Sequence, residues 1–498
     1  MTAAVAPMDN LARVWLTGST GACADRPQFV QGDMSFRRSQ LDAAVRAVAS
    51  VLEQRCACGT HVLIAMDDGI SLVIVFLAAI AAGMVPAMIH PRLPAAELAD
   101  IEADYSATLT LQGDTAMAWV AQAARDGDPA WDNWHLTPGG RPCFAQYTSG
   151  STGKPKGVLH TRDATLAVCE RLAAHFDITA RDRIYAVPRM FFGYGMGASL
   201  LLPLHTGAQA VLDPAWPTPA SILANLRAWR PSIWFAVPAI YRALRPHAAE
   251  IGTWLQRGIS AGSPLPAAEC AAWAAAGVNV CDGIGATETL HIFLANDPTR
   301  PVPGVTGSPL PGIQVRLTTD DGELVTGPDT TGLLWVRGAG IAGAYWNRET
   351  TSRERFVDGW YRTGDLFSID PSGHYRGHGR EDERFKVKGR WVAALAVEGW
   401  VTEAMGDIAE AALVPSCLRH DSSRPTFFYA VASGADDIDP DSDRARSGAI
   451  TEAVAARFPA HMVPSRIVRL PSLPRNANGK LLRARLTEHA DQLHQLKR

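Results

Sequence analysis

Short runs of β-branched and aromatic residues, each followed by a helix-like stretch, constrain the fold of this chain most. They are HVLIAM (residues 61–66), RIYAVP (183–188), QAVLD (209–213) and SIWFAVP (232–238). Strands that alternate with helices are typical of a parallel sheet, because parallel neighbours need a long crossover connection. The sequence therefore predicts an α/β fold built on parallel-type sheets.

The character of the sequence changes twice towards the C-terminus. After Asp282 the strand-like runs GIQVRL, GLLWVRG and GHYRGHGR are short and are separated by Gly, Pro and Asp, which indicates a small β-rich subdomain. From Glu381 onwards, helix and strand signals mix again. Because 498 residues are too many for one ordinary core, we expect a large N-terminal body of residues 1–379 and an α+β C-terminal domain of residues 380–498.

Charge and hydropathy argue against two broad classes of protein. The formal net charge is −3, so the sequence predicts no broad basic surface for nucleic acid. The most apolar uncharged run, residues 69–91, contains Gly83 and Pro86 and follows a strand-like run, so we expect a buried helix and not a membrane span. The first residues lack a basic stretch followed by an apolar core, so we expect a cytoplasmic protein without a secretory signal or membrane insertion.

Residues 147–157, YTSGSTGKPKG, combine glycines, hydroxyls and lysines in one short loop. Glycine lets the backbone approach a ligand closely, and amide, hydroxyl and ammonium groups together can surround a polyphosphate. The loop is not a Walker-type P-loop, because Pro155 follows Gly-Lys where that motif needs Ser or Thr. By composition alone, a flexible surface linker is the alternative. The candidate phosphate ligands are Thr148, Ser149, Gly150, Ser151, Thr152, Gly153, Lys154 and Lys156.

The order of residues in this loop resembles the phosphate-loop signature of the adenylate-forming superfamily, which contains acyl-CoA synthetases, aryl-CoA ligases, peptide-synthetase adenylation domains and luciferases. Further segments follow in the order of that family, and together with the loop they span residues 145–486. The resemblance implies that the protein uses ATP to activate a carboxylic acid as its acyl-AMP, with release of pyrophosphate. It also implies that the acyl group then passes to a thiol and that the C-terminal domain is a mobile lid.

Residues 282–288, DGIGATE, resemble the second nucleotide-binding segment of the family. The resemblance implies that Thr287 contacts the α-phosphate and that Glu288 holds Mg²⁺, an ion that bridges phosphate oxygens and offsets charge as pyrophosphate leaves. Without the resemblance, a glycine turn with a solvated glutamate is the better interpretation. Ile284 replaces the aromatic residue that often stacks on adenine. The candidate adenine-binding residues are Ala261, Gly262, Ser263, Asp282, Gly283 and Ile284.

Residues 360–365, WYRTGD, resemble the ribose-binding segment of the family. The resemblance implies that Asp365 accepts hydrogen bonds from the ribose hydroxyls, a role that suits a carboxylate. A capped turn is the alternative interpretation, since Thr-Gly-Asp is common in loops.

Residues 379–389, GREDERFKVKG, resemble the hinge and the start of the lid. The resemblance implies that Arg380 reaches the ribose, that Asp382 is the pivot of the lid, and that Gly389 lines a tunnel for the thiol. A charged, solvated turn is the alternative. The match is partial, because residues 392–396 read VAALA where the family usually has Ser/Thr-Pro-x-Glu.

Residues 473–480, LPRNANGK, resemble the C-terminal lysine segment of the family. The resemblance implies that Lys480 lies between the substrate carboxylate and the α-phosphate, where a cation lowers the cost of bringing two anions together. A lysine near a terminus is otherwise usually an exposed residue without such a role.

Four stretches, residues 190–197, 202–208, 282–294 and 338–346, are most similar to the benzoate-CoA ligase branch. They imply a pocket for a small aromatic carboxylic acid, benzoate- or hydroxybenzoate-like, because flat aromatic walls suit a flat ring. Each aromatic residue is equally well explained as ordinary core. His291 either hydrogen-bonds a ring hydroxyl or amine, or merely packs. The candidate substrate residues are Phe191, Phe192, Tyr194, Gly285, His291 and Ile292.

Coenzyme A is the usual thiol of this branch, and a phosphopantetheinyl acyl carrier protein, which has the same reacting end, is the alternative acceptor. Two other classes fit the residues less well. A P-loop ATPase or kinase would need a Walker motif. A non-catalytic sensor would be expected to lose Glu288, Asp365 or Lys480, all of which are present. We therefore expect an AMP-forming aryl acid–thiol ligase that uses ATP, Mg²⁺ and coenzyme A.

Overall fold

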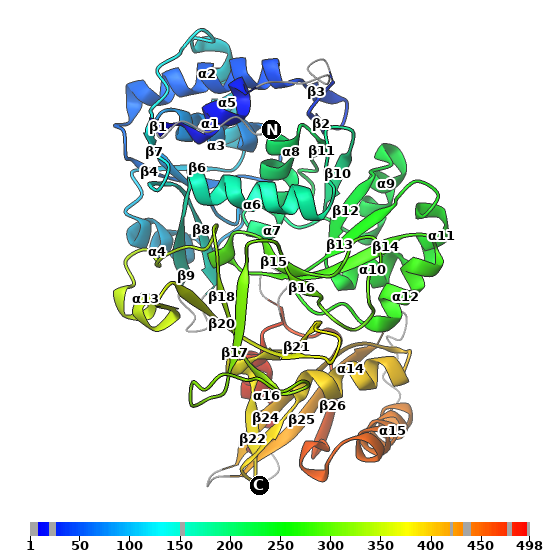
Figure 1. Ribbon diagram of the computed structural model, residues 1–498. Helices are drawn as coiled ribbons and strands as arrows, with labels where there is room; N and C mark the ends of the chain where they lie inside the picture. Colours follow the sequence, from blue (N-terminus) through cyan, green and yellow to red (C-terminus); the bar gives the residue numbers. More distant parts are fainter. Residues whose placement is uncertain are drawn as a thin grey trace. The chain divides into compact units, whose positions relative to one another are not determined.

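The protein folds into two compact units (Figure 1). The structure, a computed structural model, describes residues 8–18, 26–149, 155–418, 422–431, 440–475 and 481–495. The first unit contains Met1–Arg316, Trp335–Thr363 and Asp370–Arg376, and the second contains Leu317–Leu334, Gly364–Ile369 and Gly377–Arg498. The predicted division between residues 379 and 380 stays a prediction.

The first unit contains a nine-stranded sheet in the order β16-β15-β14-β13-β12-β10-β11-β2-β3. The strands from β14 across to β2 run parallel, and β3, β15 and β16 are antiparallel to their neighbours. The predicted strands at residues 183–188, 209–213 and 232–238 are β10, β11 and β12, which confirms the α/β prediction. The strands are β2 (Phe29–Gln31), β3 (Met34–Phe36), β10 (Arg183–Ala186), β11 (Gln209–Val211), β12 (Ile233–Ala236), β13 (Arg257–Ser260), β14 (Asn279–Gly285), β15 (Ile292–Ala295) and β16 (Ser308–Pro309).

An aromatic core lies between this sheet and the helices beside it. The ring of Trp234 on β12 lies 4.6 Å from that of Tyr241 and 5.7 Å from that of Trp273, and all three side chains are fully buried. Large buried aromatic side chains contribute strongly to stability through the apolar area that they remove from water. The helices that follow these strands are α9 (Pro219–Trp229), α10 (Pro238–Leu244), α11 (Ala248–Ile251) and α12 (Ala267–Ala275), with a 3₁₀ turn η2 (Arg245–His247).

A five-stranded sheet in the order β6-β4-β5-β8-β9 completes the main α/β part of the first unit. Its strands are parallel except β9, which pairs antiparallel with β8. The apolar run after residues 61–66 forms α3, in which every residue except Ser71 is buried, as predicted. Among the described residues, no helix is long and apolar enough to cross a membrane. The elements are β4 (His61–Ala65), α3 (Ile70–Ala81), β5 (Val85–Met88), α4 (Ala95–Tyr105), β6 (Leu109–Gln112), α5 (Gly113–Asp126), β8 (Pro142–Ser149) and β9 (Pro155–Thr161).

The other helices of the first unit connect or flank the two sheets (Figure 1). The stretch after β10 is helical, as predicted, but its middle, η1, is a π-helix, a form that often occurs at functional sites. These elements are β1 (Met8–Asp9) paired with β7 (Thr137–Pro138), α1 (Leu11–Thr17), α2 (Arg38–Arg55), α6 (Arg162–His175), α7 (Gly193–Met196), η1 (Gly197–Leu201), α8 (Leu202–Thr206), η3 (Thr287–Thr289) and α13 (Glu349–Arg355).

The predicted β-rich subdomain is a sheet in the order β17-β18-β20-β19, with β21 beside β20. The runs GIQVRL, GLLWVRG and GHYRGHGR overlap β17, β18 and β21, which confirms these strand predictions. The residues of this sheet are divided between the two units. The strands are β17 (Gln314–Thr318), β18 (Gly332–Arg337), β19 (Phe356–Val357), β20 (Trp360–Ile369) and β21 (Tyr375–Arg380).

The second unit is α+β, as predicted. A three-stranded sheet, β24-β25-β26, and a hairpin of β22 and β23 surround a core that includes Val397, Phe427 and Tyr429. The elements are η4 (Glu381–Glu383), β22 (Phe385–Val387), β23 (Arg390–Val392), α14 (Ala394–Ala404), β24 (Ile408–Leu418), β25 (Ser422–Val431), α15 (Pro440–Arg457), η5 (Ala460–Met462), β26 (Arg466–Arg469) and α16 (Arg483–Gln495).

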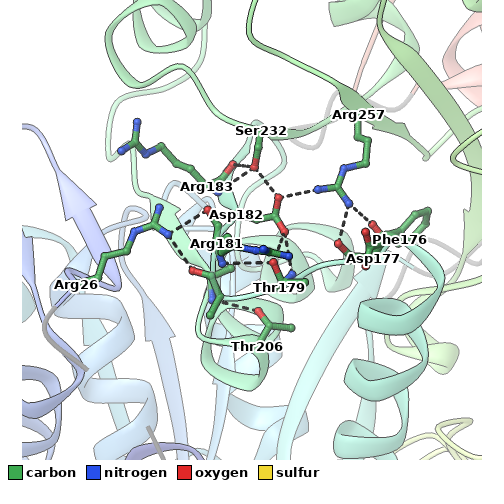
Figure 2. A network of polar contacts seen from close by, with 12 residues as sticks. Arg26, Phe176, Asp177, Thr179, Arg181, Asp182, Arg183, Thr206, Ser232 and Arg257 are labelled. Carbon is green, nitrogen blue, oxygen red and sulfur yellow. Dashed lines mark hydrogen bonds and ion pairs between the residues drawn. The ribbon is translucent and has the colours of Figure 1, made fainter. Parts of the chain in front are cut away.

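A polar network around Asp182 closes the amino ends of β10, β12 and β13 (Figure 2). The Oδ1 atom of Asp182 lies 2.6 Å from Nη2 of Arg257 and accepts a 2.8 Å hydrogen bond from Ser232. Its Oδ2 atom accepts a 2.8 Å hydrogen bond from the backbone N–H of Thr179. Both carboxylate oxygens are therefore bonded within the protein, so this end of the sheet offers them to no ligand.

Candidate active site

Near the carboxyl ends of β13 and β14 in the nine-stranded sheet, several buried polar atoms have no hydrogen-bond partner among the described residues. They include Oγ of Ser260 on β13, Oδ1 of Asp282 on β14 and Nδ1 of His291 just before β15. Buried polar atoms in folded proteins are normally bonded, and ligands of open α/β sheets bind outside the carboxyl ends of the strands. These atoms therefore mark the place where a ligand is expected to supply the missing partners.

Ser260 and Asp282 are neighbours across two parallel strands, since they are paired in the register of β13 and β14. Burial raises the pKa of Asp282 from 3.8 to about 8, so its carboxyl group holds a proton at neutral pH. The predicted adenine-binding turn follows Ser260: Ala261 is buried, and Gly262 has a φ of 91°, which suits glycine. Ser263 is exposed. The structure therefore brings the predicted adenine-binding residues of β13 and β14 together.

Glu288 lies buried in η3, directly after β14. The hydroxyl of Tyr345 donates a 2.5 Å hydrogen bond to Oε1 of Glu288, and burial together with this carboxylate raises the pKa of Tyr345. The ammonium group of Lys156 on β9 lies 5.4 Å from the centre of the Tyr345 ring. Burial lowers the pKa of Lys156, and the nearby Arg355 lowers it further. Two predicted nucleotide-binding residues, Lys156 and Glu288, are thus joined through a tyrosine.

The predicted phosphate loop connects two antiparallel strands. Thr148 pairs with Lys156 and Ser149 with Pro155, so β8 and β9 hold the two ends of the loop side by side. Trp346 donates its backbone N–H to the carbonyl of Gly157 at 2.8 Å, which attaches a further segment to β9. The side chain of Ser149 and the predicted ligands Gly150, Ser151, Thr152, Gly153 and Lys154 lie outside the described residues.

The turn between β14 and β15 holds Thr287 and Glu288 in a fixed conformation. The hydroxyl of Thr289 accepts a 2.9 Å hydrogen bond from the N–H of Ala286 and donates one of 2.8 Å to the carbonyl of His291. Leu290 is fully buried and has a φ of 64°, which is unusual for a residue other than glycine. Such strain persists only where surrounding structure enforces it, and it often occurs at active sites.

His291 is buried against the chain segment that carries Tyr194. Its Nε2 atom lies 3.2 Å from the carbonyl oxygen of Tyr194, and the two rings are 5.5 Å apart. A carbonyl oxygen can only accept, so Nε2 carries the proton and Nδ1 is an acceptor. Burial lowers the pKa of His291 to about 4, so the ring is neutral at neutral pH. A Cβ at Gly197 would lie 2.1 Å from this ring, and one at Gly285 would lie 2.5 Å from the carbonyl oxygen of His291.

The predicted aromatic wall divides into two groups. Tyr194 lies beside His291, and its hydroxyl donates to the carbonyl of Ile259 at 2.7 Å, which ties it to the end of β13. Phe191 and Phe192 are 4.3 Å apart, and Phe191 lies 4.9 Å from His90. The remaining predicted substrate residue, Ile292, is buried and pairs with Gly285 across β14 and β15. Gly283 and Ile284 lie on β14 in the same pairing.

In the second unit, the predicted ribose-binding residues form one cluster. Arg380 Nη1 donates a 3.1 Å hydrogen bond to Oδ1 of Asp365, and Arg380 Nε donates one of 3.2 Å to Oδ1 of Asp382. The predicted pivot therefore contacts the same guanidinium as the predicted ribose carboxylate. Gly389 has a φ of 76° and lies in the exposed turn between β22 and β23. The predicted catalytic lysine, Lys480, lies outside the described residues.

Sequence reasoning assigned no role to Tyr345 or Thr289. Tyr345 belongs to the stretch 338–346, whose similarity to the benzoate-CoA ligase branch was a signal that this segment approaches the site. Its contact with Glu288, 57 positions away in the chain, had no local signal. Thr289 follows the nucleotide-binding segment directly, and only the turn geometry explains its hydroxyl.

Comparisons with known proteins agree with this geometry. The family described as AMP-binding enzyme matches residues 19–346. An anthranilate–CoA ligase of Pseudomonas aeruginosa is 43% identical over 92% of this chain and 93% of its own length. A 3-hydroxybenzoate–CoA ligase of Aromatoleum sp. is 31% identical over 93% of this chain and 94% of its own length.

A solved structure has the same fold. The crystal structure of the anthranilate CoA ligase AuaEII in complex with anthranoyl-AMP gives a TM-score of 0.90 at 24% identity and covers 99% of both chains. The family match and the long alignments at 31% and 43% identity lead to one conclusion. The chain belongs to the AMP-binding enzyme family.

Proposed function

We propose that this protein is an AMP-forming ligase that joins an aromatic carboxylic acid to coenzyme A. The observation that carries the proposal is the 43% identity to an anthranilate–CoA ligase along nearly the whole length of both chains. The buried Glu288 beside Tyr345 and Lys156, next to the ends of the phosphate loop, supports the adenylation step.

In the first step, a carboxylate oxygen of the acid attacks the α-phosphorus of ATP, and the bond to pyrophosphate breaks. Thr287, Lys480 and the loop residues from Thr148 to Lys156 stabilise the charge that develops on the phosphate. Mg²⁺ would be held by Glu288 together with phosphate oxygens, and it would offset charge on the leaving pyrophosphate. One protein carboxylate plus substrate phosphates is the usual environment of Mg²⁺ in such sites.

The adenosine would be bound by two sets of residues. The protonated carboxyl of Asp282 can donate a hydrogen bond to an adenine nitrogen, which fits its raised pKa of about 8. The turn from Ala261 to Ser263 and the backbone of Gly283 and Ile284 would complete the adenine wall. Asp365 would accept from the ribose hydroxyls, and Arg380, which is bonded to it, would hold it in position.

We infer that the acid carries a hydrogen-bond donor on its ring. Nδ1 of His291 is a buried acceptor without a partner among the described residues, and the imidazole is neutral. An amine or hydroxyl group on the ring would supply that partner, whereas unsubstituted benzoate would leave it unsatisfied. The relatives named above act on an amino- and a hydroxybenzoate, which supports the same class.

In the second step, the thiolate of coenzyme A attacks the acyl carbon of the acyl-AMP, and AMP leaves. Movement of the lid about Asp382 would withdraw Lys480 and admit the thiol past Gly389, a common type of gating between steps. Both relatives are named as coenzyme A ligases, which favours coenzyme A over an acyl carrier protein.

Pyrophosphate exchange tests the first step with a panel of anthranilate, 3- and 4-hydroxybenzoate, benzoate, cinnamate and a long-chain fatty acid. We expect the highest kcat/KM with an amino- or hydroxybenzoate. Thioester formation is then measured with coenzyme A and with an acyl carrier protein. Exchange with the long-chain acid alone would refute the aromatic substrate, and transfer to the carrier protein alone would refute coenzyme A.

A further inference from the structure

Asp104, the last residue but one of α4, contacts two segments of the candidate site that lie far apart in the chain. Its Oδ2 atom accepts a 2.9 Å hydrogen bond from the hydroxyl of Tyr147 on β8, the first residue of the predicted phosphate loop. Its Oδ1 atom lies 2.5 Å from Nη2 of Arg348. The side chain of Asp104 is 15% exposed, so both carboxylate oxygens bind partners within the protein and largely away from water.

The backbone of Asp104 binds the second of these segments as well. Its carbonyl oxygen accepts a 2.9 Å hydrogen bond from Nε1 of Trp346 and one of 3.2 Å from Nδ2 of Asn347. The last carbonyl groups of a helix have no partner within the helix, and the partial negative charge at this end attracts a cation such as Arg348. Three consecutive residues directly after Tyr345 are therefore attached to Asp104.

Aromatic packing closes the same junction. The fully buried ring of Tyr105 lies 5.6 Å from the ring of Tyr147 and 6.1 Å from that of Trp346. A Cβ at Gly157 would lie 3.2 Å from Cβ of Trp346 and from Cζ of Tyr147, so the absence of a side chain allows this close approach. The start and the end of the predicted phosphate loop are thus packed against the segment that follows Tyr345.

Charge connects Asp104 to Lys156 as well. Burial lowers the pKa of Lys156, and the positive charges of Arg355 and Arg348 lower it further. Asp104 pairs with Arg348 and so offsets one of these charges. Burial raises the pKa of Tyr147, and the hydrogen bond to Asp104 raises it further, so the hydroxyl stays protonated and donates. The carboxylate therefore orients Tyr147 and balances a cation near the lysine that is predicted to bind phosphate.

We propose that Asp104 is a positioning residue for ATP, an inference that rests on the proposed function. It holds Lys156 and the Tyr345–Glu288 pair in the relative positions that phosphate oxygens and Mg²⁺ require. Asp104 acts through its bonds to β8 on one side and to residues 346–348 on the other. Polar groups that are held in place before a ligand binds need no reorganisation when it arrives. Loss of this carboxylate should therefore weaken the binding of ATP and not that of the acid, because the predicted acid-binding residues lie on other segments.

Pyrophosphate exchange at varied concentrations of MgATP tests this role in the full chain. Asp104→Asn keeps the size of the side chain and an acceptor for Tyr147, but it removes the charge that pairs with Arg348. We expect it to raise the KM for ATP about tenfold and to lower kcat less than about threefold, because a group that supports the ground state and the transition state alike alters KM and not kcat. The KM for the aryl acid should change less than about twofold. Tyr147→Phe removes only the hydroxyl and should raise the KM for ATP about threefold.

A matched control lies on the same helix. Glu102 on α4 accepts a 2.6 Å hydrogen bond from the hydroxyl of Thr110, so Glu102→Gln alters a similar pair of a carboxylate and a hydroxyl elsewhere. Its KM for ATP should equal that of the unaltered protein. The double variant Asp104→Asn/Arg348→Gln should raise the KM for ATP no more than Asp104→Asn alone, because both changes break the same ion pair. Thermal unfolding of each variant gives its folded fraction at the assay temperature.

Two kinetic outcomes would overturn the positioning role. If Asp104→Asn only lowered the thermal midpoint and left the KM for ATP within about twofold of that of the unaltered protein, the contacts of Asp104 would be purely structural. An equal rise in the KM values for ATP and for the acid, or effects that multiply in the double variant, would also contradict it.

Failure of the proposed function gives a different result. Absence of pyrophosphate exchange with every aryl acid in the unaltered protein would refute the proposed function. Calorimetric titration with MgATP needs no acid and measures nucleotide binding directly. Binding to Asp104→Asn about tenfold weaker than to the unaltered protein would then support the positioning role, and equal binding would overturn it.

Discussion

The two ends of the nine-stranded sheet satisfy their polar groups in different ways. At the amino ends, Asp182 is bonded through both carboxylate oxygens to Arg257, Ser232 and Thr179 (Figure 2). Near the carboxyl ends, Asp282 and His291 each keep a buried polar atom without a partner among the described residues. The amino end therefore stabilises the fold, whereas the carboxyl end keeps binding capacity for a ligand at a cost in stability.

Structural and functional residues of one chemical type differ in their hydrogen-bond partners. Aspartates and hydroxyl residues occur at both ends, so residue type alone does not distinguish them. What differs is whether neighbouring segments complete the hydrogen bonds. Variants at the amino end should thus lower stability and spare chemistry, and variants at the carboxyl end should do the reverse.

The largest expected effect is at Glu288. The Glu288→Gln variant should lower the rate of pyrophosphate exchange by about 10²–10³-fold, because an amide holds Mg²⁺ poorly while it can still accept from Tyr345. Its thermal midpoint should change by less than about 2 °C. Glu269→Gln is the matched control, since Glu269 on α12 is also buried but pairs with Arg245 of η2. A pyrophosphate-exchange rate within tenfold of that of the unaltered protein would contradict the functional role of Glu288.

The second effect is at Asp182, at the amino end. The Asp182→Ala variant should destabilise the first unit by roughly 3–5 kcal/mol, because Arg257 and Ser232 lose their partner in a largely buried place. Thermal unfolding followed by near-UV circular dichroism measures this loss. The exchange rate per folded molecule should stay within about twofold at low temperature. A stable but inactive variant would contradict the structural role.

The third effect concerns the pH dependence of stability. The folded-state pKa of Asp282 is about 8 against an ordinary value of 3.8, so the native state binds the extra proton between these values. Stability therefore falls as pH rises from about 4 through 8, and it is lowest above the folded-state pKa. Asp282→Asn should remove this decline and stabilise the ligand-free protein by roughly 2 kcal/mol at pH 8.5. Chemical unfolding across this pH range measures the free energy of unfolding of both proteins. If this free energy depended on pH in the same way in both, the raised pKa of Asp282 would be contradicted.

The smallest effect is at His291, where Nδ1 is expected to accept a hydrogen bond from the donor group on the ring of the acid. His291→Phe should lower kcat/KM for the preferred amino- or hydroxybenzoate about tenfold relative to that for benzoate, because the ring donor loses its acceptor. Pyrophosphate exchange with both acids gives this ratio. Equal losses for the two acids would mean that His291 only packs.

Much of the fold follows from local patterns. The runs at residues 183–188, 209–213 and 232–238 became β10, β11 and β12, and the apolar stretch after residues 61–66 became α3. These predictions hold because apolar periodicity and glycine or proline breaks act within a few residues. The π-helix between α7 and α8 was not predicted, since its geometry depends on packing and not on local propensity.

The sequence predicted individual residues of the candidate site but not the contacts between them. Motifs identified Glu288, Lys156 and Asp365, but the tyrosine that joins Glu288 to Lys156 comes from a distant segment. Phe191 and Tyr194, three positions apart, were expected to line one wall. In the structure they have different aromatic neighbours, because the chain enters α7 between them.

The sequence by itself determined the α/β class, the order of the nucleotide-binding segments and the membership that these segments imply. These properties depend on short stretches of sequence. The residue types and spacing in each stretch directly restrict the backbone conformation and the possible chemistry. The tertiary contacts determine that Asp182 forms an ion pair with Arg257 while Asp282 stays protonated, and that Nδ1 of His291 is an acceptor. Burial and hydrogen-bond partners come from segments far away in the chain, so protonation and binding capacity exist only once those segments meet.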